Sequence, residues 1–343
     1  MKKCYYNKKC MPKEFSWGPV SGKNTVTEHG IFQGSRFCGI PKPLKYIIGH
    51  VFLILLSCFI LLPGCSASKG KERADRAIAI KNPVNRIVST APSNTEIIAD
   101  LGQAHKLVAI DKHSANIEGL PANLPLLDFF YPDAEVIIKL EPDLIIASGH
   151  NPTGSGEDPF RLLSEMGIPV VYISMSKSIT GIFRDISLIA ELLQAENEGN
   201  NLINSMIEQI AKTAQMATNI ESRRTVYFEI SAAPDMMTFG KDSFIHDMIS
   251  TIGARNIFEN ENWLVTPGAE AVIALNPDVI LTNVNYIDDP VGEIKKRPGF
   301  NHINAVINNR VYQIDTDSSV RPSARIVLAL QQMSQAVYPE LYE

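Results

Sequence analysis

Residues 135–146 read EVIIKLEPDLII and residues 270–281 read EAVIALNPDVIL, and the two stretches align without a gap. Each starts with Glu, continues with apolar residues at helical spacing, and passes through Pro-Asp into a β-branched run. This pattern predicts a helix that leads directly into a buried strand. Because the same unit occurs twice, we expect two pseudo-equivalent lobes produced by an internal duplication.

Outward from this repeat, short β-branched runs alternate with helical patterns, which is typical of parallel α/β units. Strands are expected at 86–90, 107–111, 144–148 and 170–173 in the first lobe, and at 225–230, 279–282 and 311–314 in the second. The first helix should start with Ser93 or Asn94 as N-cap and Glu96 in its first turn. A final helix is expected over 323–337.

Residues 178–217 contain no Pro and carry apolar residues at helical spacing, which predicts a long connecting helix with Gly199 as its one weak point. The predicted fold is therefore α/β, with two lobes joined by one long connecting helix. Its parts are an N-terminal extension with a signal peptide (1–64), a tether (65–81), an N-terminal lobe (82–176), the connecting helix (177–219) and a C-terminal lobe (220–343).

All five cysteines lie at or before Cys65, so the main body must fold without disulfides, thiolate metal ligands or a cysteine nucleophile. Lys42 and Lys45 precede an apolar run that ends in Leu-Pro-Gly-Cys at 62–65. A charged flank, a short hydrophobic stretch and a small residue before the cut are typical of a secretory signal. The stretch resembles a bacterial lipoprotein signal, which implies that Cys65 is lipidated and that the protein is extracytoplasmic; the alternative is an uncleaved membrane anchor.

The predicted mature part is acidic. Of 32 Lys/Arg and 37 Asp/Glu in the chain, residues 1–64 carry nine and two, which leaves 23 basic and 35 acidic residues after cleavage. A nucleic-acid partner would require a basic stripe, so this composition argues against nucleic-acid binding.

Five stretches in the order found here resemble the family of iron-siderophore, haem and cobalamin binding proteins of ABC importers. They are RIVSTAPSNTEIIADLG (86–102), EVIIKLEPDLIIASG (135–149), FGKDSFIHDMISTIGARNIF (239–258), EAVIALNPDVIL (270–281) and RPSARIVLALQQM (321–333). The resemblance implies two Rossmann-like lobes, a dimeric permease with its cytoplasmic ATPase as partner, and a small metal-organic ligand. An iron(III)-siderophore is preferred because that class is the broadest, with cobalamin or haem as alternatives and no cofactor expected.

The same resemblance implies that Glu135 and Glu270, one on each lobe, dock into arginines of the permease. Charge pairs across an interface steer association and fix its orientation. The alternative is that each Glu only complements the positive end of its helix.

Ligands of bilobal α/β proteins bind at the carboxyl ends of the strands, between the lobes. Several candidates have structural alternatives: helix capping for Ser93 and Asn94, loop packing for Trp263, and an internal ion pair between Asp317 and Arg321. His150 is either a solvated loop residue or a ligand contact, and the aromatic run at 129–131 is either core or pocket wall. The predicted ligand-binding residues are Ser93, Asn94, Tyr131, His150, Asn151, Trp263, Asn285, Tyr286, Asp317 and Arg321.

Competing functions are less well supported. A binder of bare metal ions would present several His and carboxylates at ligand spacing, and the histidines after residue 100 are scattered. No GxSxG or HExxH motif is present, so we expect no enzyme activity. A surface sensor or adhesion protein on the same fold is a further alternative.

Overall fold

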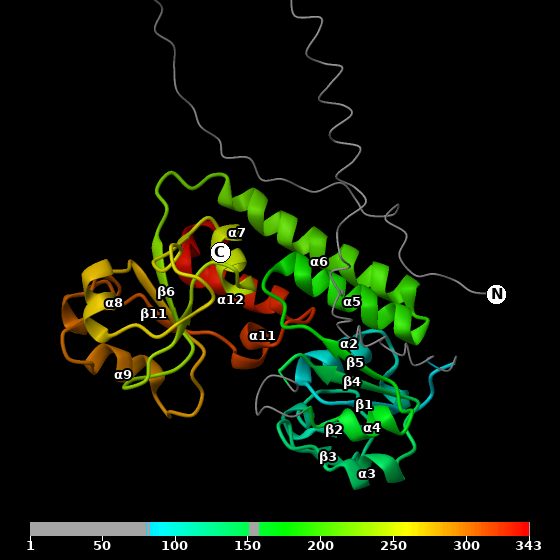
Figure 1. Ribbon diagram of the computed structural model, residues 1–343. Coiled ribbons are helices and arrows are strands. Elements are labelled where there is room, and N and C mark those ends of the chain that lie inside the picture. The colour runs from blue at the N-terminus through cyan, green and yellow to red at the C-terminus, as the bar shows by residue number, and fades with distance from the viewer. Residues whose placement is uncertain (1–79, 81–82, 151–157, 343) are drawn as a thin grey trace, which may run out of the picture. The chain divides into compact units, whose positions relative to one another are not determined.

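The computed structural model describes residues 80, 83–150 and 158–342. The described residues belong to one compact unit, Asp75–Glu343, which contains two α/β lobes. The predictions of a signal peptide at 1–64, lipidation of Cys65, a tether and a role for Asn151 fall outside the described residues. Figure 1 labels the helices and strands by which the two lobes are described below.

The N-terminal lobe is built on a parallel sheet with strand order β3-β2-β1-β4-β5. The central strands have apolar side chains on both faces, so β-branched residues run through them without polar alternation. Ile87 faces one hydrophobic cluster and Val88 faces another. The strands are β1 (Ile87–Ser89), β2 (Leu107–Asp111), β3 (Leu126–Leu127), β4 (Leu144–Ser148) and β5 (Val170–Ile173).

The C-terminal lobe repeats this design with strand order β11-β10-β6-β8, again parallel. Val226 and Phe228 face one cluster, while Tyr227 between them faces the other. A short antiparallel pair, β7 with β9, lies apart from this sheet. The strands are β6 (Thr225–Glu229), β7 (Thr238–Phe239), β8 (Arg255–Asn256), β9 (Leu264–Val265), β10 (Val279–Thr282) and β11 (Val311–Gln313).

Helices pack against both sheets. Two of them, α3 and α8, are the predicted helices of the repeat. The helices are α2 (Pro92–Asp100), α3 (Ala134–Lys139), α4 (Arg161–Glu165), α5 (Ile179–Leu193), α6 (Glu196–Ala217), α7 (Phe244–Thr251), α8 (Ala269–Leu275), α9 (Pro290–Lys296), α10 (Asn304–Ile307), α11 (Thr316–Val320), α12 (Ile326–Val337) and α13 (Pro339–Tyr342), with 3-10 turns at Ala104–Lys106, Lys112–Ser114 and Phe300–His302.

The repeat has the same structural role in both lobes. The Pro-Asp carboxylate of the first copy, Asp143, accepts hydrogen bonds from the backbone amides of Asn85 and Arg86 at 3.0 Å, just before β1. In the second copy, Asp278 accepts bonds from the backbone amide of Thr225 at 2.9 Å and from its hydroxyl at 2.8 Å. Each Asp therefore ties the strand of the repeat to the first strand of its own lobe.

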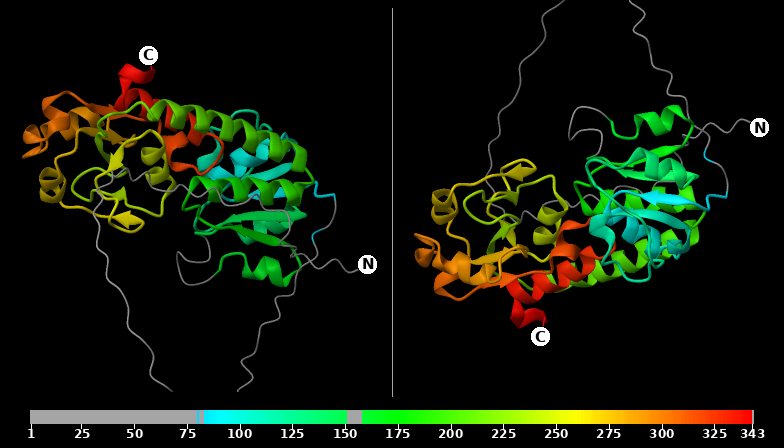
Figure 2. Two further views of the ribbon diagram at one scale, coloured as in Figure 1. Left: turned by 90° about the horizontal axis from the view of Figure 1, so that it is seen from above. Right: turned by 90° about the horizontal axis from the view of Figure 1, so that it is seen from below.

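The connection between the lobes differs from the single predicted helix. The chain forms two helices, α5 and α6, which pack against each other and are separated at Gln194, a residue with φ of 57°. Gly199 is not the break; it lies inside α6, where a Cβ would come within 2.6 Å of the Ala190 Cβ. α6 packs against α5 and also against α12 and α7 of the C-terminal lobe (Figure 2).

One hydrophobic cluster runs through both lobes. It includes Ile97 of α2, Ile186 of α5, Met206 of α6 and Leu330 of α12, together with Phe228 of β6. The N-terminus of α5 is also held from the other lobe, because the Asp247 carboxylate on α7 accepts a hydrogen bond from the Ile179 amide at 2.9 Å. The lobes thus share a core and do not hang on a flexible linker.

Candidate functional site

The carboxyl edge of the N-terminal sheet presents an aromatic surface. Phe129 follows β3, and its ring centroid lies 6.5 Å from that of His113 and 6.1 Å from that of His150, which follow β2 and β4. Phe130 packs edge-on against Phe129 at 4.8 Å. Because Phe130 and Tyr131 are 56% and 74% exposed, the run at 129–131 is a surface wall and not part of the core.

Asp128 shapes this wall. Its carboxylate accepts hydrogen bonds from the backbone amides of Phe130 at 2.9 Å and Tyr131 at 3.0 Å, and it pairs with Lys112 at 2.8 Å. The Lys112 contact, followed by the two amide bonds, lowers the pKa of Asp128 to about 2. The carboxylate therefore stays charged at neutral pH and holds the two exposed rings in place.

His150 keeps the uncharged form more readily than a free imidazole. Loss of water around the ring, which lies beside Phe129, lowers the pKa of His150. A neutral imidazole can accept a hydrogen bond or coordinate a metal, so the position is compatible with the predicted ligand contact.

In the C-terminal lobe, Trp263 and Tyr286 lie at the edge that faces this aromatic surface of the N-terminal lobe. Trp263 has φ of 51°, and its ring centroid lies 5.1 Å from that of Phe239 in a tilted contact. Lys177, from the segment entering α5, lies 5.4 Å from the indole centroid. The Tyr286 hydroxyl accepts a hydrogen bond from the Ala232 amide at 2.8 Å and leaves the ring 66% exposed. Tyr286 is thus held by its own lobe with its ring exposed, whereas the half-buried Trp263 ring is contacted by Phe239 and Lys177.

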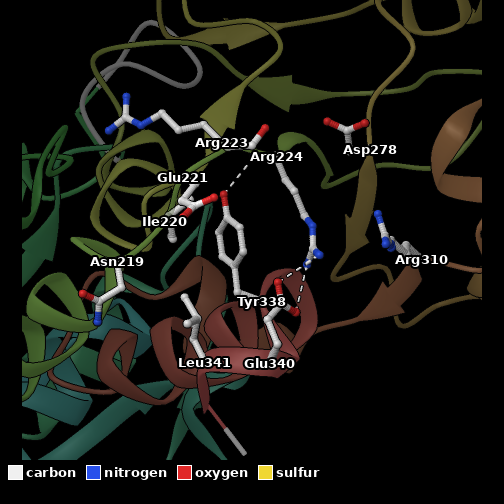
Figure 3. A pocket seen from close by; sticks show the side chains of 11 residues that line it. Asn219, Ile220, Glu221, Arg223, Arg224, Asp278, Arg310, Tyr338, Glu340 and Leu341 are labelled. Carbon is white, nitrogen blue, oxygen red and sulfur yellow. Dashed lines mark hydrogen bonds and ion pairs between the residues drawn. The ribbon is translucent and has the colours of Figure 1, made fainter.

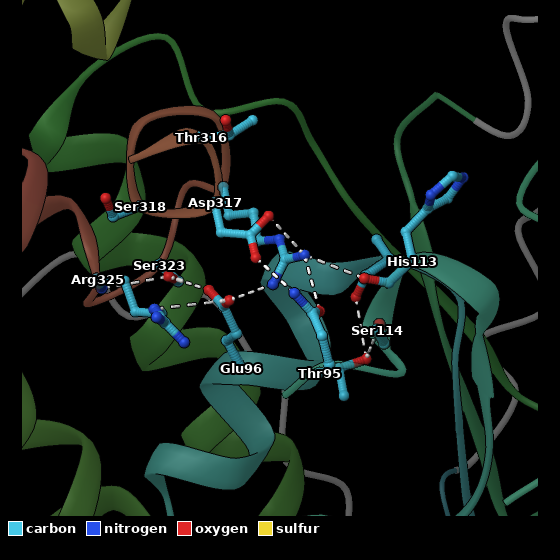
Figure 4. A network of polar contacts seen from close by, with 12 residues as sticks. Thr95, Glu96, His113, Ser114, Thr316, Asp317, Ser318, Ser323 and Arg325 are labelled. Carbon is cyan, nitrogen blue, oxygen red and sulfur yellow. Dashed lines mark hydrogen bonds and ion pairs between the residues drawn. The ribbon is translucent and has the colours of Figure 1, made fainter. Parts of the chain in front are cut away.

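Arg321 joins the two lobes directly. Figure 4 shows the surrounding network, in which Glu96, His113 and Asp317 are labelled. Its guanidinium donates to the Glu96 carboxylate on α2 at 2.8 Å, to the His113 carbonyl at 3.0 Å and to the Asn116 side-chain oxygen at 3.1 Å. It also pairs with Asp317 at 2.9 Å, and Ser323 donates to Glu96 at 2.5 Å. Arg321 and Glu96 are only 7% and 2% exposed, so this is a buried ionic joint.

A hollow of ≈ 530 Å³ lies next to the joint and is lined from both lobes. Asn116 belongs to the N-terminal lobe, and Asn285, Gln313 and Gln332 add three more carboxamides from the C-terminal lobe. Partial burial raises the pKa of Asp315 here, but hydrogen bonds from the Ser318 hydroxyl and amide outweigh it and leave that pKa below its ordinary value. The hollow is therefore polar and carries negative charge.

Some predicted ligand residues are not accessible in this structure. Asn94 is 1% exposed and its amide donates to the Ala147 carbonyl at 3.3 Å, so it ties α2 to the end of β4. Ser93 is half-buried within the first turn. The N-cap prediction was wrong, because Pro92 starts the helix and Ala91 is its cap residue. Arg321 pairs with Asp317, which is the internal ion pair named above as the alternative to a ligand contact.

Glu135 and Glu270 occupy equivalent places. Each is the second residue of its helix and is exposed, and neither carboxylate forms an ion pair with a described residue. Capping of α3 is done by Asp133, whose carboxylate accepts the amides of Glu135 and Val136 at 2.9 and 3.2 Å. The Glu135 side chain is thus not needed as a cap.

A second hollow, of ≈ 450 Å³, lies at the amino ends of the C-terminal strands (Figure 3). Arg224 lies over the Tyr338 ring at 5.1 Å and pairs with Glu340 at 2.9 Å, while Arg310 and Asp278 lie nearby (Figure 3). Because this hollow is on the opposite edge of the sheet from Trp263 and Asn285, it is separate from the predicted ligand region.

Several residues at the site carry no recognisable signal in the sequence. Glu96 was expected only as a first-turn residue of a helix, and its partner Arg321 is 225 residues away. Asn116 and Lys177 carry no motif. Asp128 could have been suggested by its position two residues before Phe130, since Asp side chains often accept such amide bonds in turns.

Within the described residues, no group of three or more His, Cys, Asp or Glu side chains converges in a way that could hold a metal ion. In the same part of the chain, every helix is too short or too polar to cross a membrane.

Two parallel α/β lobes, a shared helical core between them, and aromatic and polar side chains at facing strand ends define a bilobal substrate-binding protein. The chain belongs to the periplasmic binding protein family, whose model matches residues 87–318.

Individual relatives agree with this assignment. An ABC transporter substrate-binding lipoprotein of Bacillus subtilis is 28% identical over 85% of this chain and 98% of its own length. A vitamin B12-binding protein of Vibrio campbellii is 26% identical over 74% of this chain and 89% of its own. A solved periplasmic solute-binding protein of Staphylococcus epidermidis has a TM-score of 0.68 at 29% identity, covering 75% of this chain and 99% of that structure.

Proposed function

We propose that this protein is the lipid-anchored, extracytoplasmic substrate-binding protein of an ABC importer and captures a metal-organic complex between its lobes. Ferric chelates, haem and corrinoids are the ligand classes to be tested, and a permease dimer with its cytoplasmic ATPase is the partner. The observation that carries the proposal is the pair of facing carboxyl edges, with Phe130 and Tyr131 on one lobe and Trp263 and Tyr286 on the other. Exposed aromatic faces suit a planar or bulky complex.

Lipidation of Cys65 would keep the mature protein near its membrane partner. Glu135 and Glu270 would then form the docking contacts, one per lobe, because both are exposed at equivalent helix starts without internal ion-pair partners among the described residues. Two charged contacts on separate lobes define one orientation on a dimeric permease better than a single contact does.

Capture is tested by titrating the mature protein with ferric siderophores, haem, cobalamin and bare metal ions while following tryptophan fluorescence. Trp263 is the reporter, since the other tryptophan, Trp17, precedes Cys65. Saturable quenching by one complex is expected. A response to bare ions alone, with no response to any complex, would contradict the proposed ligand class.

Docking is tested in liposomes that contain the permease and ATPase encoded nearest to this protein. The double variant Glu135→Lys/Glu270→Lys should abolish uptake and leave ligand affinity unchanged. The matched control reverses two exposed glutamates of α6, Glu198→Lys/Glu208→Lys, and should transport normally. Loss of ligand binding in the first variant would place the glutamates in the fold or the pocket instead.

A further inference from the structure

The four loops that follow the parallel strands of the C-terminal lobe are strongly acidic. Residues 230–237, 257–263, 283–289 and 314–321 contain seven Asp or Glu and one basic residue, Arg321. The opposite edge of the same lobe has balanced charge around the second hollow, where three arginines (Arg223, Arg224 and Arg310) stand beside three acidic residues (Glu221, Asp278 and Glu340). Charge of one sign lining a cleft sets up a field that selects ligands of the other sign or of none.

Three of the basic residues near this edge are paired with carboxylates. Arg321 is buried against Glu96 and Asp317. Arg297, after α9, is 7% exposed and pairs with Glu229 at 2.7 Å and with Glu293. On the N-terminal edge, Lys112 pairs with Asp128 at 2.8 Å. Lys177, at the entry to α5, lies over the Trp263 ring, and Lys241, whose backbone bonds to Glu261 and Trp263, is exposed.

On these four loops an anionic ligand would therefore meet more carboxylates than available positive charge, because Asp235, Glu261 and Asp288 are exposed whereas Arg321 is already paired. Ferric tris-catecholates carry several negative charges, and haem carries two propionates. Removing carboxylates and such a ligand from water together is unfavourable, because like charges repel more strongly as the local dielectric constant falls. This edge of the protein is poorly suited to both.

The hollow beside the joint offers a different chemistry. Its carboxamides come from Asn116, Asn285, Gln313 and Gln332, and a carboxamide both donates and accepts hydrogen bonds. Three of them have protein partners, which orients the groups: Asn116 with Asp317, Gln313 with the Val284 carbonyl, and Gln332 with the Asp315 amide. Asn285 is exposed, and no hydrogen bond reaches its amide within the described residues.

We propose that the interlobe site selects a neutral or cationic metal complex with a rim of carboxamide groups, the chemistry of a corrinoid, over anionic ferric catecholates and dicarboxylate porphyrins. This inference rests on the proposed capture function. The aromatic wall at 129–131 and Trp263 receive the flat faces of the complex, Asn285 bonds its rim, and the acidic loops repel anionic competitors.

Calorimetric titration of the mature protein tests the inference with four probes. They are cyanocobalamin, which is uncharged; ferrichrome, an uncharged hydroxamate complex; hemin; and a trianionic ferric tris-catecholate. Cyanocobalamin is expected to bind at least about tenfold more tightly than the others, as one or two lost hydrogen bonds or a charge repulsion would produce.

Two variants connect the result to the named residues. Asn285→Ala should weaken cyanocobalamin binding by roughly threefold to tenfold. Asp235→Asn/Glu261→Gln/Asp288→Asn, three exposed side chains of the acidic loops, should tighten hemin or tris-catecholate binding by a similar factor and change cyanocobalamin binding by less than about twofold. The control Glu165→Gln/Glu198→Gln/Glu208→Gln removes the same charge away from these loops and should leave all four affinities unchanged.

The outcomes separate the inference from the function on which it rests. Tightest binding of hemin or the tris-catecholate would overturn the charge selection while supporting capture. Equal binding of ferrichrome and cyanocobalamin would overturn the role of the carboxamide rim. Binding of none of the four probes would refute both the inference and the capture of metal-organic complexes.

Discussion

At the scale of single residues, similar side chains of the repeat divide into internal and external roles. Asp143 and Asp278 turn inward and bind the first strand of their lobe, whereas Glu135 and Glu270 remain exposed at helix starts. The internal role explains why Pro-Asp occurs in both copies without invoking a ligand. It leaves Glu135 and Glu270 as the acidic residues, common to both copies, that are available to a partner.

Asp278→Ala should reduce the free energy of unfolding by about 1.5–3 kcal/mol, because the Thr225 amide loses a charge-assisted partner. Urea denaturation measures the loss. Asp288→Ala, an exposed site, is the control and should change stability by less than about 0.5 kcal/mol. An equal effect of both substitutions would contradict the strand-tying role.

The same carboxylate predicts a pH dependence. Partial burial raises the pKa of Asp278, but hydrogen bonds from Thr225 and Asn304 outweigh it, and the pKa lies below the ordinary 3.8. A lowered folded-state pKa means that the stabilisation is present above 3.8 and is lost as pH falls through the lowered value. The difference in stability between the wild type and Asp278→Ala should therefore shrink below about pH 4.

At the scale of elements, α5 and α6 pack closely against each other in the connection between the lobes. Gly199 lets α6 approach Ala190 of α5, since a side-chain carbon there would lie 2.6 Å from the Ala190 Cβ. The residue looks like a weak point when helix propensity alone is considered. In the folded protein it is the contact that brings the two helices together.

Gly199→Ala should lower stability by about 1–2 kcal/mol, because the steric clash exceeds the roughly 1 kcal/mol gained in helix propensity. The exchange Ala190→Gly/Gly199→Ala should recover most of the loss, because removing the Ala190 Cβ makes room for the new Cβ at position 199. Thermal unfolding of the three proteins is the measurement. A stabilised single variant would show that the helices can separate at no cost.

Arg321→Met should be more damaging, because it leaves the buried Glu96 carboxylate without its main partner. A loss of about 3–5 kcal/mol is expected from breaking a buried ion pair. Glu96→Gln/Arg321→Met should recover much of it. Burial raises the pKa of Glu96 despite bonds from Ser323 and Arg321, so folding disfavours the charged carboxylate relative to the unfolded chain and Arg321 offsets part of that cost. The deficit of the single variant should therefore grow as pH rises above about 4.5, as urea titrations across pH will show.

At the scale of the whole molecule, the lobes are joined in three ways: by α6, by a hydrophobic cluster that includes residues of both, and by the Arg321–Glu96 contact. Each would have to break for a wide opening. Such a joint permits small adjustments at the carboxyl edges and opposes large rotations.

Ligand binding should therefore leave the radius of gyration in small-angle X-ray scattering unchanged within error. The Arg321→Met variant, which lacks the ionic contact, is the informative comparison and should show a larger change on ligand addition. A large compaction of the wild-type protein on binding would contradict the rigid joint.

Local sequence determined the longer strands, the order of the α/β units and the two equivalent lobes, because β-branched runs and the Pro-Asp repeat depend on neighbouring residues. It did not predict the two-residue strands β3, β7, β8 and β9. Six of the seven predicted strand starts match, including those at 107, 144 and 279. The break at Gln194, the inward role of Asn94 and the Glu96–Arg321 joint were decided only in the tertiary structure. Their physical reason is the same: helix packing, burial and ion pairing join residues that are distant in the chain, and periodicity contains no information about such partners.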